Sequence, residues 1–319
     1  MPKGLKLFLL LAAVIFAASL YVAMVGKIGL ALRNYYPGTP LHGRVDWGFV
    51  SAALFDAVSL VVTLLLAGLA VRPQFRAARA MFIALTAYSV LFNLPSAAFL
   101  IIKSHFDFSG VAQIMAIIGH SEVFRFTPYV ATALPLLQLG AMALLFTGAS
   151  RSWFETAGPE VVRLNLSMPL AVKLVAVACF LIGLGWSWNY LGRTAISEQL
   201  AVAHGHHPGA AADRIFDLGL LLVKVGMILA VGALVACWRR VWVGWAAMAL
   251  LGNFALYGLF TEAFVLPVLI KDMHGMPGLP LYAVLSPYAV LAAAVLCGLA
   301  VFLLLLPGSR QWFATAKSE

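Results

Sequence analysis

The sequence predicts an all-α integral membrane protein with eight transmembrane helices, arranged as two tandem four-helix repeats with a parallel pseudo-twofold axis along the membrane normal. Three observations lead to this fold class. First, 63% of the 319 residues are hydrophobic and 10% are charged, whereas soluble domains have about 45–50% apolar and about 25% charged residues. Second, the apolar residues form long unbroken runs, which favours helices over the alternating strands of a membrane barrel. Third, the end of the first half recurs at the end of the second.

A membrane-spanning helix needs about 20 mainly apolar residues. The first such segment follows Lys3 and Lys6 and resembles a secretory signal, but its apolar character continues to Leu32 and indicates a retained helix. A short interfacial helix is expected within 103–126, and a loop over 192–213. The eight expected spans are 5–26, 49–71, 80–102, 127–148, 170–191, 215–237, 241–269 and 284–306.

The repeat is clearest in residues 127–157 and 286–316. At a constant offset, Pro-Tyr matches Pro-Tyr and Ser-Arg-x-Trp-Phe-x-Thr-Ala matches itself. Domains are therefore expected at 1–157 and 158–319. Two halves with an even number of spans each have the same orientation, as in parallel-repeat transporters. Duplication for stability alone, with no pathway between the halves, is the alternative.

Arginine and lysine positions predict the orientation. Arg72, Arg76 and Arg79 crowd one short connection and Arg239-Arg240 another, on the same side as both termini if there are eight spans. The positive-inside rule then places both termini in the cytoplasm, with a bacterial inner membrane as the expected location. The net charge of +9 does not indicate nucleic-acid binding, because no basic run carries interleaved aromatic residues.

Ionisable groups inside a bilayer are costly and invite a functional interpretation. Five polar residues of the expected spans are candidates for a substrate or ion pathway. Asp217 and Lys224 are two helical turns apart on one face of the sixth span. The alternative is a set of local pairs near the outer face, with asparagine serving as an interhelical hydrogen-bonding group. The candidates are Asp56, Asp217, Lys224, Asn253 and Glu262.

The histidines fall in the loops expected on the outer side. His204, His206 and His207 are clustered, and His274 stands beside Met273 and near Met276. Imidazole with thioether sulfur suits copper, and clustered imidazole also suits zinc. No recognised ligand spacing is present, so ordinary polar loop residues are the favoured alternative. The cofactor is left open, and one option is that there is none.

The sequence lacks a nucleophile elbow, a zinc-protease motif, a Walker loop and a dinucleotide fingerprint, which favours a non-enzyme. The first functional hypothesis is a transporter or permeation protein for a small solute or ion, with its pathway between the repeats. The second is a scaffold or accessory subunit. The third is a metal-handling protein that uses the outer-side histidines. Besides lipid, the expected partners are another membrane protein or a second copy of the chain.

Overall fold

The computed structural model describes residues 1–23, 47–105, 127–155, 168–203, 211–238, 240–274 and 278–314. Within these residues the secondary structure is helical, with no strand. This confirms the all-α prediction. The chain divides into two compact units, Met1–Pro159 and Glu160–Glu319.

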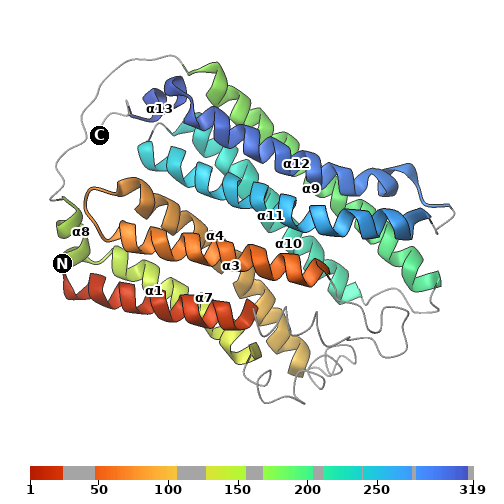
Figure 1. Ribbon diagram of the computed structural model, residues 1–319, viewed down its shortest axis with the longest axis horizontal. Coiled ribbons are helices and arrows are strands. Elements are labelled where there is room, and N and C mark those ends of the chain that lie inside the picture. Colours follow the sequence, from red (N-terminus) through yellow and green to blue (C-terminus); the bar gives the residue numbers. More distant parts are fainter. Residues whose placement is uncertain are drawn as a thin grey trace. The chain divides into compact units, whose positions relative to one another are not determined.

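The first unit packs its helices around α1. In Figure 1, α1 lies beside α3 and α7, and α4 contacts both α3 and α7. A short helix, α8, follows α7 after a bend of 52°. The helices of this unit are α1 (Lys3–Tyr21), α3 (Trp47–Ala70), α4 (Arg76–His105), α7 (Thr127–Leu145) and α8 (Gly148–Glu155).

One face of α1 forms part of the core of the first unit. Leu5, Phe8 and Ala12 recur at helical spacing and are buried, and the Phe8 ring meets Phe82 of α4 edge-on at 5.2 Å. The opposite face exposes Leu7 and Leu10. A helix that is apolar on its outer face as well as its inner face is what a lipid environment favours.

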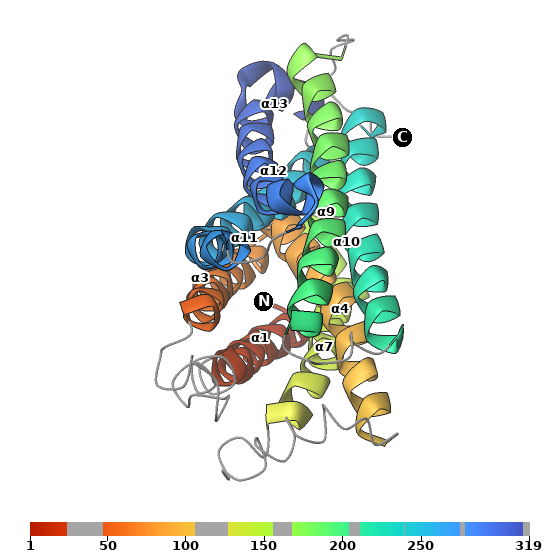
Figure 2. The ribbon, with the colours of Figure 1, turned by 90° about the vertical axis from the view of Figure 1, so that its right-hand side faces the viewer.

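The second unit is built around the close pair α9 and α12. These two helices lie side by side in Figures 1 and 2, α10 packs on α9, and α11 packs on α12. Small residues permit the close approach: a Cβ added at Gly185 would lie 3.1 Å from the Ala289 carbonyl oxygen. The helices are α9 (Leu170–Ala203), α10 (Ala211–Cys237), α11 (Val241–His274), α12 (Leu281–Leu305) and α13 (Pro307–Ala314).

Five helices within the described residues are long and apolar enough to cross a bilayer: α1, α9, α10, α11 and α12. The bent pair of α7 and α8 makes a sixth candidate, and the apolar described part of α3 is the shorter stretch Leu54–Ala70. The protein is therefore membrane-embedded. The predicted loop over 192–213 is wrong in part, because α9 continues to Ala203 and α10 begins at Ala211. Residues 106–126, where a short helix was expected, lie outside the described residues.

The two Ser-Arg-x-Trp-Phe segments adopt the same local structure. Each begins a new eight-residue helix, α8 or α13, directly after a longer one. The Ser150 hydroxyl donates to the Leu144 carbonyl at 2.7 Å, and the Ser309 hydroxyl donates to the Leu303 carbonyl at 2.7 Å. Both serines are buried. Each hydroxyl thus bonds a carbonyl in the last turn of the preceding helix, where carbonyls lack the usual backbone donor four residues on.

Candidate functional site

Lys224 lies inside an apolar span of the second unit. It belongs to the stretch Leu218–Cys237 of α10, and its side chain is half-buried. Six residues at about 1.5 Å each place it about 9 Å from Leu218 along the helix. A lysine ammonium at this depth has to be stabilised by neighbouring helices or reach toward the membrane surface.

Aromatic rings from two other helices flank this ammonium. Lys224 Nζ lies 6.0 Å from the ring centroid of Trp186 on α9 and 5.7 Å from that of Tyr257 on α11. Both distances fall within the roughly 6 Å range of cation–π attraction. Trp186 is itself held edge-on against Phe254 of α11 at 4.7 Å, so its indole is fixed in place. We call Trp186, Lys224, Phe254 and Tyr257 the lysine–aromatic cluster.

The other predicted pathway residues are distributed over both units. Asn253 lies on α11, next to Phe254 of the cluster, and is half-buried. Asp217 on α10 and Glu262 on α11 are placed as helical residues, and their side chains lie outside the described part. Asp56 is half-buried on α3 and belongs to the first unit, whereas Lys224 and Asn253 belong to the second.

Polar side chains of the first unit form interhelical hydrogen bonds. Ser89 on α4 accepts from Gln138 Nε2 on α7 at 3.0 Å and from Asn93 Nδ2 at 3.0 Å. The Ser89 hydroxyl also lies 3.2 Å from Gln138 Oε1. The Gln138 contacts link α7 to α4, as expected for an amide side chain in a span, whereas the Asn93 bond lies within α4.

The predicted metal ligands are only partly placed. His204, His206 and His207 lie outside the described residues, and His274, expected in a loop, is the last residue of α11, with its side chain outside the described part. Among the residues that the structure describes, no group of three or more His, Cys, Asp or Glu side chains is arranged to hold a metal ion. The histidine site stays a prediction.

Sequence reasoning singled out Lys224 by its depth but missed its aromatic neighbours. A signal was available: tryptophan prefers the membrane–water interface, yet Trp186 stands well inside the apolar run of α9. Trp186, Phe254 and Tyr257 come from segments far apart in the chain, and only the packing of α9, α10 and α11 brings them together. No known protein family, curated protein or solved structure matches this chain.

Proposed function

We propose that this protein transports, or allows permeation of, a small solute or ion, and that Lys224 is the functional group of the second unit. The observation that carries the proposal is the position of Lys224 in the lysine–aromatic cluster, inside an apolar span. At the centre of a membrane helix a lysine costs about 2.5–3.5 kcal/mol. A cation–π contact contributes about 0.5–1 kcal/mol at an exposed site and about 2 kcal/mol where the cation is desolvated. A lysine at such a position invites a functional interpretation.

The aromatic neighbours add a reason to connect Lys224 with a pathway. Two helices, α9 and α11, place aromatic residues of the cluster beside the ammonium that α10 carries. A charge fixed between helices responds to any change in their separation, which is the behaviour required of a gating or coupling group. A pathway between the two repeats stays a prediction from the sequence.

Flux measurements on purified protein in vesicles test this function. We expect at least one member of a panel of chloride, potassium, protons, phosphate and neutral amino acids to cross faster than in protein-free vesicles. Lys224→Met, which keeps an unbranched side chain one atom shorter but removes its charge, should abolish this flux, and Lys224→Arg should retain part of it. Lys173→Met, at the exposed start of α9, is the matched control and should leave the flux unchanged.

Two results would contradict the proposal. Absence of flux for the whole panel, with the protein folded in the vesicles, would favour a scaffold. An unchanged flux in Lys224→Met would show that Lys224 is a structural residue whose ammonium extends toward the membrane surface.

We also propose the finer topology: eight spans in two tandem four-helix repeats, with both termini on the cytoplasmic side of a bacterial inner membrane. Its support is local and comes from each unit separately. The start of α1 and the start of α9 share the same bonds, from Leu5 and Lys6 to the Pro2 carbonyl and from Val172 and Lys173 to the Pro169 carbonyl. The Ser150 and Ser309 hydrogen bonds recur in the same way.

Reporter fusions test this topology. Alkaline phosphatase is active only outside the cytoplasm, so fusions after residues 160 and 319 should be inactive and a fusion after residue 207 should be active. An active fusion at residue 319 would contradict a cytoplasmic C-terminus. Different activities of the fusions at residues 160 and 319 would contradict an even number of spans in the second unit.

A further inference from the structure

Basic residues gather at one end of the first unit. Gly4 lies beside Thr147 and Ser150, where α8 begins, and the Trp153 indole of α8 donates to the Val71 carbonyl at 3.0 Å. The start of α1, the turn between α3 and α4, and α8 therefore meet at this end. We call it the basic end. Its cationic residues are Lys3, Lys6, Arg72, Arg76, Arg79 and Arg151.

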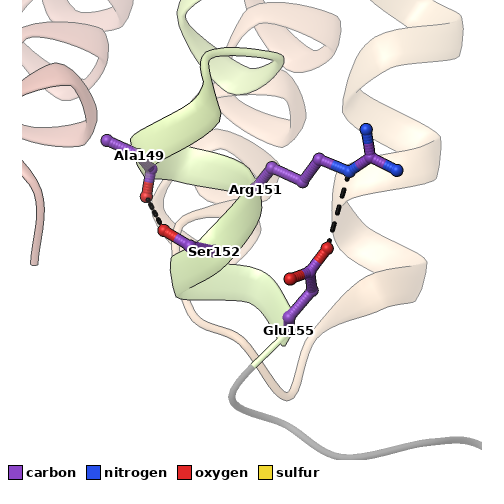
Figure 3. A network of polar contacts seen from close by, with 4 residues as sticks. All are labelled: Ala149, Arg151, Ser152 and Glu155. Carbon is purple, nitrogen blue, oxygen red and sulfur yellow. Dashed lines mark hydrogen bonds and ion pairs between the residues drawn. The ribbon is translucent and has the colours of Figure 1, made fainter.

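Little negative charge offsets these cations. Among the described residues of the first unit the acidic side chains are Asp56 and Glu155. Glu155 is paired with Arg151 at 3.5 Å on the exposed surface of α8 (Figure 3). Asp56 stands fourteen residues before Ala70 on α3, which is about 21 Å along the helix. Within the part of the first unit that the structure describes, the basic end thus has an excess of positive charge.

Arg79 supplies a charge held in a fixed position. Its Nε donates to the Ala70 carbonyl at 3.3 Å, and its guanidinium carbon lies 3.2 Å from the centroid of the Phe154 ring. Burial, with a smaller contribution from Arg76, lowers the pKa of Arg79 to about 10, which leaves the guanidinium protonated at neutral pH. Arg76 stands three residues before Arg79, so the two residues lie on the same side of α4.

The second unit differs at the comparable place. Arg79 is the fourth residue of α4, and Gly244 is the fourth residue of α11. Phe154 of α8 lies against Arg79, whereas Phe313 of α13 lies against Gly244 so closely that an added Cβ would come within 2.9 Å of its ring. Gly244 therefore offers no counterpart to the guanidinium that Arg79 places against the phenylalanine ring.

The position of the basic end relative to the apolar stretch of α1 indicates what it binds. Lys3 and Lys6 begin α1, whose apolar stretch Lys3–Tyr21 is long enough to cross a bilayer. Trp153 lies at the same end, and tryptophan and arginine both favour the headgroup region. We propose that the basic end binds the phosphate group of an anionic phospholipid, with Arg72 and Arg76 as contact residues and Arg79 as a fixed positive charge behind them.

Native mass spectrometry of the full chain in detergent tests this site. Phosphatidylglycerol should bind more tightly than phosphatidylcholine with the same acyl chains. Arg72→Gln with Arg76→Gln should weaken phosphatidylglycerol binding about 25-fold, since each basic residue near an anionic surface contributes about fivefold. Lys173→Gln with Arg310→Gln removes the same charge from the second unit and should have a much smaller effect.

Equal losses in the two double variants would overturn the proposal, because they would show diffuse attraction rather than a site. Displacement of the lipid by inorganic phosphate, but not by chloride at the same ionic strength, would assign the site to free phosphate and also overturn it. Arg72→Lys with Arg76→Lys keeps the charge, so its phosphatidylglycerol binding should exceed that of the glutamine variant. Equal binding of these two variants would contradict the charge-based argument even if the glutamine variant were poorly folded.

Discussion

Gly192 is the most demanding packing position between α9 and α12. A Cβ added there would overlap the Ser286 side chain and would lie 3.2 Å from the Ala283 Cα. Ser286 is fully buried, and its hydroxyl donates to the Ala283 carbonyl at 2.8 Å, so it has little freedom to move aside. Gly192→Ala should therefore force the two helices apart.

The magnitude follows from comparison with a second glycine. Overpacking a filled interior costs about 1–3 kcal/mol, and the overlap with a Cβ and a backbone atom indicates the upper half of this range. Replacing glycine by alanine also favours the helix by about 1 kcal/mol. Gly226 on α10 has nothing within 4 Å of an added Cβ. The gain in helix propensity is the same in both variants, so the difference in their free energies of unfolding is the packing cost at Gly192.

Unfolding in mixed micelles by increasing sodium dodecyl sulfate, followed by circular dichroism, measures this difference. We expect Gly192→Ala to be about 2–3 kcal/mol less stable than Gly226→Ala. Ser286→Gly in the Gly192→Ala background should recover most of the loss, after allowance for the effect of Ser286→Gly alone. Equal stability of the two alanine variants would refute the close approach of α9 and α12 at this point.

Two further predictions concern α8 and α13. Trp153→Phe removes the indole hydrogen bond to Val71 and should lower the free energy of unfolding by about 1 kcal/mol. The control Trp242→Phe, at an exposed ring, should lower it less. Equal effects of the two variants would contradict a contribution of this hydrogen bond to stability. Gly244→Ala should destabilise the protein by about 1–3 kcal/mol, because Phe313 is buried against it. Its control on the same helix is Gly252→Ala, where an added Cβ would be 4.0 Å from Val301. A larger loss of stability in Gly252→Ala than in Gly244→Ala would contradict the contact between Phe313 and Gly244.

Helical character and membrane insertion were predictable because they depend on local properties. Long apolar runs dictate helices in lipid, and their ranges follow from the residues themselves. The end of α9 was less predictable: residues 192–203 include polar side chains and were interpreted as a loop, yet the helix continues through them. Outside an apolar span, polar helix formers such as Glu198 and Gln199 extend a helix without leaving a hydrophobic signal.

Contacts between distant segments were not predictable. The sequence placed Lys224 in a span by its position alone, but the aromatic neighbours depend on how α9 and α11 rotate about their axes. The same holds for Arg79, which sequence analysis assigned only to a charged turn. Its contact with Phe154 depends on the bend of 52° between α7 and α8, which a hydropathy pattern does not encode.

Arg79 and Gly244 show how two similar ends acquire different properties. In each unit a phenylalanine of the short terminal helix is buried against the first turn of a longer helix. With glycine at that turn, the ring packs directly on the backbone and the contact is purely apolar. With arginine, the ring supports a guanidinium that also satisfies the Ala70 carbonyl at the end of α3. The arginine at this turn thus adds a fixed charge without removing the buried aromatic ring, which is why we expect lipid selectivity at the basic end of the first unit.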